Sequence, residues 1–279
     1  MNNIPIVYQD QDLWVVNKPA GIVVNQAQTV SEQTIQDWAA KEISKQDLAN
    51  DWLSLVPADF SADYGTPEDI FTQRQGIVHR LDKDTSGAMI IAKNPGALVH
   101  LLAQFRKREV TKQYQCLTHG KFSIMTDTID LPLARSKADR QKFTTDPEGR
   151  NAKTAYQVQK FYPHLEVEPV TERLKETNSS VKNFGKRSKI YQGFSLVDCW
   201  PKTGRTHQIR VHMAALKHPL VGDTKYVGRK RAALDPAWCP RQFLHAMEIG
   251  FTQPRTGKHI VVKVPLADDL VEVLTLLKE

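Results

Sequence analysis

Residues 78–94 read VHRLDKDTSGAMIIAKN, and this stretch places a carboxylate shortly before an apolar run. Asp82 lies two positions after Arg80 and directly before Lys83, so cations flank it on both sides. The apolar run of residues 88–92 predicts a buried strand. Two interpretations are open at this point. Asp82 is either a turn acid in a salt bridge or a catalytic carboxylate that its neighbours keep ionised.

Working outward, the first third of the chain predicts strands and helices in turn. Residues 4–10 and 13–24 have strand character, although Pro19 and Gly21 divide the second run into a strand, a loop and a second strand. Residues 31–45 predict a helix with an apolar face. Residues 94–108 predict another helix, which begins with an asparagine cap and a proline and ends in cations.

The rest of the chain has mainly β character, which favours an α+β protein with a mixed, mainly antiparallel sheet and flanking helices. Residues 203–218 predict a turn followed by a helix, and residues 267–279 predict a final helix. Polar stretches at about 50–74 and 171–188 predict loop insertions. No linker stands out, so we expect a single catalytic domain over residues 1–279. Strands are predicted for residues 76–79, 110–120, 154–162, 190–200, 243–251 and 259–266.

The charge of the chain points to a polyanionic partner. Among 279 residues there are 38 Lys and Arg against 31 Asp and Glu, a formal net charge of +7. Clustered cations suit phosphate binding, although a solvated basic face would look the same. The clusters are Arg106, Lys107, Arg108 and Lys112; Arg135, Lys137, Arg140 and Lys142; Lys182, Lys186, Arg187 and Lys189; and Arg229, Lys230 and Arg231.

Several function classes find no support in the sequence. No apolar run of about 18 residues predicts a membrane span, and no secretory signal is visible. Three cysteines without a CxxC motif argue against a disulfide framework and favour a reducing, cytoplasmic setting. Motifs for nucleotide cofactors are missing, and so is a nucleophile elbow. His207 and His212 are five residues apart without the HExxH pattern, so we predict no metal.

A second stretch has a composition suited to a binding or catalytic site. Residues 201–226 read PKTGRTHQIRVHMAALKHPLVGDTKY, with Arg205 directly after a glycine. An arginine presented by a tight glycine turn is a rigid bidentate donor for a carboxylate or a phosphate. Residues this far apart in the sequence from Asp82 can still meet it in one cleft.

Four stretches together resemble the motif set of the RluA-type pseudouridine synthases. They are NKPAGIVV, HRLDKDTSG, KQYQCLTHG and KTGRTHQIRVHMAALKHPLVGD, in the family's order, and the resemblance extends from about residue 7 to 265. It implies the pseudouridine synthase fold with a central basic RNA-binding cleft. It also implies an isomerase that needs no cofactor and acts on uridines in rRNA or tRNA stem-loops. We expect a monomer without the S4-type RNA-binding domain that many members carry.

The resemblance also implies roles for individual residues. Asp82 matches the essential aspartate, and Tyr114 matches the tyrosine that lies against the flipped base. Arg205 matches the arginine that pairs with the aspartate, and Arg80 matches the arginine that enters the RNA stack. Asn17, Lys18, Pro19 and Gly21 match a motif that supports the catalytic loop. Further expected RNA contacts are His79, Lys83, Thr85, Lys112, His207, Arg210, Arg140 and Lys142.

Two other functions remain as alternatives. A catalytically silent RNA-binding or ribosome-assembly factor would keep the cleft for recognition alone, although the presence of Asp82 argues against it. A glycosidase would need two carboxylates that converge on one sugar. Asp84 is the nearest second acid, and a salt bridge or turn contact suits it better.

Overall fold

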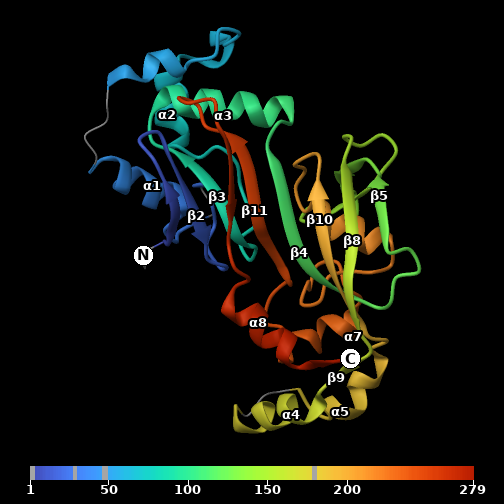
Figure 1. Ribbon diagram of the computed structural model, residues 1–279. Coiled ribbons are helices and arrows are strands. Elements are labelled where there is room, and N and C mark those ends of the chain that lie inside the picture. Colours follow the sequence, from blue (N-terminus) through green and yellow to red (C-terminus); the bar gives the residue numbers. More distant parts are fainter. Residues whose placement is uncertain (1–3, 28–29, 46–49, 178–180) are drawn as a thin grey trace. The chain divides into compact units, whose positions relative to one another are not determined.

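The computed structural model describes residues 4–27, 30–45, 50–177 and 181–279 (Figure 1). The chain divides into two compact units, and each is built from stretches that are distant in sequence. Unit 1 comprises Met1–Lys112 and Ala246–Pro265, and unit 2 comprises Gln113–His245 and Leu266–Glu279. Because the chain passes between the units several times, a composition shift or a single linker could not reveal them. That the two units act as one catalytic domain stays a prediction.

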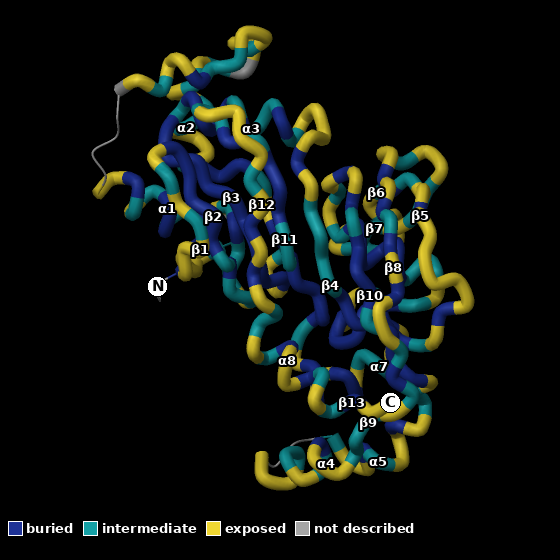
Figure 2. Tube along the Cα trace, in the orientation of Figure 1, coloured by how far each residue is buried: buried dark blue, intermediate teal, exposed yellow. Residues whose placement is uncertain are grey.

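Unit 1 is built on antiparallel strands. Its strands, in their order of neighbours, are β1 (Ile6–Gln9), β2 (Leu13–Lys18), β3 (Ser86–Ala92), β11 (Leu244–Thr252) and β12 (His259–Lys263). All seven residues of β3 are buried (Figure 2), as the apolar run predicts. The register of β2 on β3 sets Lys18 opposite Gly87. The end of β2 therefore lies beside the start of β3, next to the residues that precede it.

Unit 1 has three α-helices, which begin at side-chain caps, and two 3-10 helices. They are α1 (Ile35–Ile43), the 3-10 helices η1 (Asn50–Leu55) and η2 (Ala62–Tyr64), α2 (Pro67–Arg74) and α3 (Pro95–Lys107). Asn94 caps α3 by accepting the N–H of Ala97, and Thr34 and Asp37 form a capping box on α1. Leu98 and Leu101 of α3 pack in one core cluster with Ile90 of β3.

Unit 2 has its own antiparallel strands and a small hairpin. In order of neighbours the strands are β4 (Thr111–His119), β10 (Phe194–Pro201), β8 (Lys153–Tyr162) and β5 (Thr126–Asp130); the hairpin is β6 (Leu133–Arg135) with β7 (Phe143–Thr145); and β9 (His164–Leu165) pairs with β13 (Leu277–Lys278). Its helices are α4 (Val167–Glu176), α5 (Phe184–Arg187), η3 (Ser188–Ile190), α6 (Gln208–Ala215), α7 (Arg229–Ala232), η4 (Asp235–Ala237) and α8 (Asp268–Thr275). Phe194, Trp238 and Phe243 lie in its core.

The predicted fold class is confirmed, because the structure is mainly antiparallel sheet with flanking helices. Three details were wrong. Residues 76–79 form no strand, and Ile77 makes only an isolated β-bridge with Ile91. The stretches at about 50–74 and 171–188 are not plain loops, since the first contains η1, η2 and α2, and the second contains most of α4 and all of α5. Thr66 and Asp69 form a capping box at α2, a signal that the polar composition concealed. Residues 21–24 form no strand, because the backbone turns at Pro19 and Gly21.

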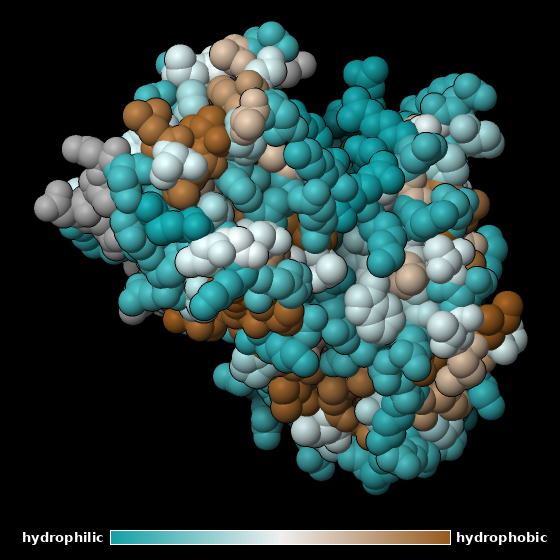
Figure 3. All heavy atoms as spheres, turned by 45° about the horizontal axis from the view of Figure 1, so that its top comes forward, coloured by the Kyte–Doolittle hydropathy of each residue, from teal (hydrophilic) through white to brown (hydrophobic). Residues whose placement is uncertain are grey.

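The exposed surface agrees with the polar composition. In the face that Figure 3 shows, hydrophilic residues predominate and hydrophobic ones form separate smaller groups. None of the helices in the described parts of the chain combines the length and the apolar character needed to cross a membrane.

Candidate active site

The loop that carries Asp82 is fastened through its backbone. The carbonyl of Lys83 accepts the Nζ of Lys18 at 3.0 Å and the N–H of Gly21 at 2.9 Å. Lys18 also donates to the carbonyl of Pro19 at 2.7 Å, and its side chain is fully buried. The N–H of Thr85 donates to the carbonyl of Asp82 at 3.1 Å, which closes a turn. The two sequence motifs around residues 18 and 82 therefore meet in unit 1.

The glycine that ends the TSG motif is required by close packing. Gly87 has a φ of +117°, and a Cβ at this position would lie 2.3 Å from the carbonyl oxygen of Ala246. A side chain here would push β3 away from β11. The position of the Asp82 loop therefore depends on this close approach between backbones.

Three side chains of the Asp82 loop face outward to different degrees. Arg80 and Lys83 are exposed, whereas Asp82 is half-buried. Lys83 forms an ion pair with Glu32 at 3.4 Å, and both side chains are well exposed. A carboxylate in this position is accessible and has cations close to it in the sequence.

His79, at the start of the loop, packs inward. Its Nε2 accepts the N–H of Ile90 at 3.0 Å, and its ring stacks on Phe105 of α3. Burial, with a smaller contribution from the charge of Lys112, lowers the pKa of His79 to about 3. The imidazole is therefore neutral at physiological pH. Lys112 lies over the same Phe105 ring, and burial lowers its pKa to about 8.

Tyr114 lies on β4, two residues beyond Lys112, so the strand directs both side chains to the same face. Its register partner on β10 is Cys199. Tyr114 is partly exposed and packs against the core of unit 2. A phenol ring that is fixed at one side and accessible at the other can stack on a planar ligand.

The segment that carries Arg205 is organised around one buried amide. The Oε1 of Gln208 accepts the hydroxyl of Thr203 at 2.7 Å and the N–H of Arg205 at 3.0 Å. The Nε2 of Gln208 donates to the carbonyl of Lys153 at 3.0 Å. Within unit 2, the Nε of Arg205 donates to the carbonyl of Asn151 at 3.1 Å. This bond orients the guanidinium three residues before α6 begins.

Two further contacts hold the start of α6. The Nδ1 of His207 lies 2.8 Å from the hydroxyl of Tyr226, which accepts the N–H of Phe143 at 3.0 Å. Arg210 makes a bidentate pair with Asp223, with N···O distances of 2.7 and 2.8 Å. Arg210 is 5% exposed and Asp223 is 1% exposed. These contacts join the hairpin of β6 and β7 to the segment that carries Arg205.

Two of the expected RNA contacts are buried, and a third, the half-buried His79, bonds within the protein. Thr85 is buried, with its N–H on the loop carbonyl, and His79 gives its Nε2 to the backbone of β3. The guanidinium of Arg210 is buried and bound to Asp223. The sequence showed the polarity of these residues but not their burial. The remaining residues of that set are at least partly exposed, among them Arg140 and Lys142 in the loop between β6 and β7.

Several residues for which the sequence predicted no role make contacts that hold the candidate site residues in place. Asp223 and Tyr226 hold the second motif, Gln208 organises it, and Phe105 supports His79. Asp223 and Tyr226 belong to the quoted stretch of residues 201–226, so their position was a usable signal. Phe105 gave none, because its contact with His79 is tertiary.

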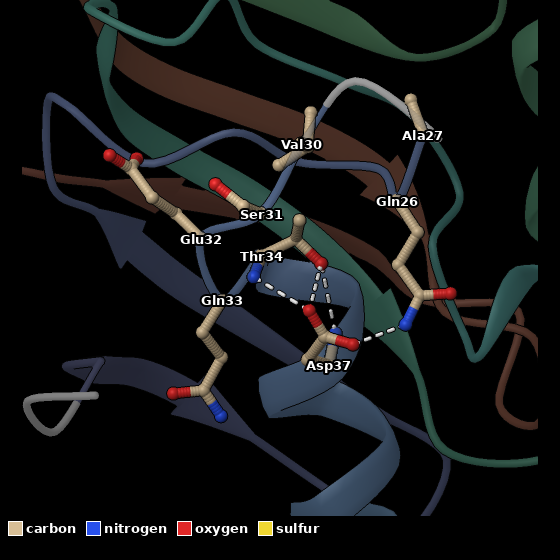
Figure 4. Close-up of a pocket in the computed structure, with 8 residues that line it drawn as sticks. All are labelled: Gln26, Ala27, Val30, Ser31, Glu32, Gln33, Thr34 and Asp37. Carbon is tan, nitrogen blue, oxygen red and sulfur yellow. Dashed lines mark hydrogen bonds between the residues drawn. The ribbon is translucent and has the colours of Figure 1, made fainter.

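One surface pocket of unit 1 has a residue in its lining that contacts the Asp82 loop, but several of its other lining residues cap a helix. Gln26, Ser31, Glu32, Thr34 and Asp37 line it together with Ala27, Val30 and Gln33 (Figure 4). Thr34 and Asp37 are engaged in the cap of α1, and Gln26 donates to Asp37. Glu32 reaches the loop through its ion pair with Lys83. This pocket is therefore not the candidate active site.

The described part of the chain contains no group of three His, Cys, Asp or Glu side chains that could hold a metal ion. Cys116, Cys199 and Cys239 are buried free thiols. Burial raises the pKa of Cys199 and of Cys239, so both stay protonated.

Comparison with known proteins identifies the family of this chain. A family model described as RNA pseudouridylate synthase matches residues 12–215. An uncharacterised RNA pseudouridine synthase of Bacillus subtilis, YlyB, is 36% identical over 99% of this chain and 74% of its own length. The ribosomal large subunit pseudouridine synthase D of Vibrio cholerae is 32% identical over 98% of this chain and 71% of its own length.

Solved structures share the fold. Human RNA pseudouridylate synthase domain containing 4 gives a TM-score of 0.65 at 21% identity, covering 99% of this chain and 94% of that protein. Human RNA pseudouridylate synthase domain containing 1 gives a TM-score of 0.63 at 24% identity, covering 94% and 83%. The family match covers most of the chain and includes Asp82, Tyr114 and Arg205. The chain therefore belongs to the RluA-type family of RNA pseudouridine synthases, which are isomerases that modify RNA.

Proposed function

We propose that this enzyme converts specific uridines to pseudouridine in structured rRNA or tRNA, with Asp82 as the reacting carboxylate. The observation that supports this most directly is the double hydrogen bond from Lys18 and Gly21 to the carbonyl of Lys83. It fixes the backbone directly after Asp82, and a reacting group gains from a fixed position.

The reaction requires an ionised carboxylate and no redox step. The bond between C1′ and N1 of the nucleoside breaks, the base turns, and C5 bonds to C1′ while its proton leaves and N1 gains one. Asp82 acts either as a nucleophile at the sugar or as a base on it. We propose that Arg205 pairs with Asp82 and keeps it charged when substrate displaces water. No cofactor is needed for this chemistry.

Flipping the uridine out of a folded RNA costs a few kcal/mol. We propose that Arg80 fills the gap left in the stack and that Tyr114 lies against the extruded base. The exposure of Arg80 and the partial exposure of Tyr114 support these roles. Stacking of a base on an aromatic ring contributes about 1–3 kcal/mol, which offsets part of the cost.

Large-subunit rRNA is the first substrate to test, because the Vibrio cholerae relative is named for it. We propose that Lys83, Lys112, His207, Arg140 and Lys142 approach its phosphates, and that the enzyme acts as a monomer in the cytoplasm. A tRNA stem-loop is the second substrate, since a short A-form stem with a loop occurs in both RNAs.

The deciding experiment compares Asp82→Asn with Asp84→Asn on total RNA from a strain that lacks the gene. New pseudouridines are mapped by carbodiimide adducts and reverse-transcription stops. We expect stops with the wild type and with Asp84→Asn, which alters an exposed acid of the same loop, and none with Asp82→Asn. Tight, salt-sensitive RNA binding without stops from the wild type would instead favour a silent RNA-binding factor. Stops that persist with Asp82→Asn would exclude Asp82 as the reacting group.

A further inference from the structure

Two segments of unit 2 carry many cations and no acid. Residues 181–191 and residues 224–234 contain four Lys or Arg each, which makes eight, against a net charge of +7 for the whole chain. The rest of the chain is therefore close to neutral. Most of the eight side chains are exposed. They are Lys182, Lys186, Arg187 and Lys189 in the first segment, and Lys225, Arg229, Lys230 and Arg231 in the second.

Among the residues that the structure describes, none of the eight has an acid within ion-pair distance. The acids that flank the second segment are buried and engaged elsewhere. Asp223 is paired with Arg210. Asp235 accepts His119 at 2.8 Å and the N–H of Gly222 at 3.1 Å. The positive charge is therefore available to an external anion.

Hydrogen bonds tie the two segments to one another. The hydroxyl of Tyr191, at the end of the first segment, donates to Asp235 at 2.9 Å, directly after the second segment. The indole N–H of Trp238 donates to the same hydroxyl at 3.2 Å. Phe184 anchors α5 in the core at 2% exposure. In Figures 1 and 2, α5 and α7 lie at the same end of unit 2, near β9. Hydrogen bonds and core packing therefore hold the backbone that carries these cations.

The second segment also leads to the motif that carries Arg205. Tyr226 lies between Lys225 and α7, and its hydroxyl contacts His207. The N–H of Lys225 donates to Asp223, the partner of Arg210. An RNA strand that reaches His207 can therefore continue along the cations of the second segment within the same unit.

We propose that these two segments form a second RNA-binding surface, which holds the backbone of the substrate RNA beyond the stem that presents the uridine. This inference rests on the proposed function. Lys and Arg without acids or base-reading groups suit phosphates of any sequence. An acidic protein partner fits less well. The large exposed hydrophobic side chains of the described residues lie outside both segments, so the apolar anchors of a protein interface are missing.

The test uses the full-length double variant Lys186→Gln with Lys230→Gln. Its matched control is Lys41→Gln with Lys258→Gln, which removes two exposed cations from unit 1. Each protein is assayed on the long rRNA fragment that contains the mapped target and on the minimal stem-loop. We expect about tenfold weaker binding and a higher KM on the long RNA, with kcat unchanged. The slope of log K against log salt should fall by about two, since each phosphate contact contributes roughly 0.9.

On the minimal stem-loop, both double variants should match the wild type. Equal losses with the control variant, equal losses on both RNAs, or an unchanged salt slope on the long RNA would each overturn the second surface. Failure of the proposed function looks different. The wild type would then modify neither RNA, while the salt slope of binding would still test the surface.

Discussion

The loop that carries Asp82 in unit 1 and the segment that carries Arg205 in unit 2 are held in different ways. In unit 1, the buried Lys18 and the N–H of Gly21 converge on one backbone carbonyl. In unit 2, several side chains share the task, with Gln208, Tyr226 and Asp223 each fixing another part of the segment. The first arrangement depends on few groups near the reacting acid. The second distributes the contacts over several side chains and includes a buried ion pair.

Because of this difference, we expect substitutions in the two regions to affect stability and activity unequally. A buried ion pair stabilises little by itself, but breaking it leaves a buried charge without a partner. A buried ammonium on a loop carbonyl contributes less to stability but fixes the backbone next to Asp82. We call the two hydrogen bonds from Lys18 and Gly21 to the carbonyl of Lys83 the clamp of unit 1. We expect changes in the ion pair of unit 2 to affect folding most, and changes in this clamp to affect catalysis most.

The largest effect on stability is expected for Asp223→Asn. The variant leaves Arg210 buried without its carboxylate, which should lower the free energy of unfolding by about 3–5 kcal/mol. Asp269→Asn is the control, because Asp269 pairs with Arg241 in the same unit but is 42% exposed. The control should lose about 1 kcal/mol or less. Urea denaturation measures both, and equal losses would contradict the role of burial.

The variant Lys18→Met should reduce activity more than Asp223→Asn does. The carbonyls of Lys83 and Pro19 lose a donor, at a cost of about 1–3 kcal/mol in stability. A displaced Asp82 should lower kcat by up to about 100-fold. Lys93→Met is the control, because Lys93 is also buried and donates to a carbonyl, that of Asp10. If both variants lose the same activity, the clamp has no specific effect on the loop.

Acid should destabilise unit 1 through His79. Its pKa is about 3 in the folded protein and about 6.5 in the unfolded chain, so between these values only the unfolded chain binds the proton. Stability is therefore lost as the pH falls below about 6.5, by up to about 1.4 kcal/mol per pH unit. His79→Gln keeps an acceptor for Ile90 but cannot titrate. Its unfolding free energy, measured from pH 7 to pH 5, should fall less steeply than that of the wild type. Parallel curves would refute this.

The smallest effect is expected for Tyr226→Phe. The variant removes the hydroxyl that contacts His207 and accepts the N–H of Phe143, at a cost of about 1 kcal/mol. Because Gln208 and Asp223 still hold the segment, kcat should change only a few-fold. A fall in kcat as large as that of Lys18→Met would show that Gln208 and Asp223 cannot hold the segment without the hydroxyl of Tyr226.

Local patterns in the sequence were sufficient for much of the fold. The cap of α3 and the buried run of β3 are short-range features, so both elements were predicted close to their observed bounds. The apolar face of residues 31–45 predicted α1, which begins only at Ile35, after its cap Thr34. The polar composition of the two insertions concealed the capping box of α2, and α4 and α5 have no side-chain cap that could have marked their starts. The hairpin of β6 and β7 was missed because short strands with few apolar residues give a weak periodic signal.

The sequence by itself determined the family, because its motifs are contiguous and the chemistry needs those residue types. It also identified Asp82, Tyr114 and Arg205 as candidates. Only the tertiary structure decided which polar residues are available to RNA. Thr85 and Arg210 lie in the same motifs as exposed residues, yet they are buried, because burial depends on contacts between residues that are distant along the chain. For the same reason, only the structure showed that Lys18 binds the loop of Asp82.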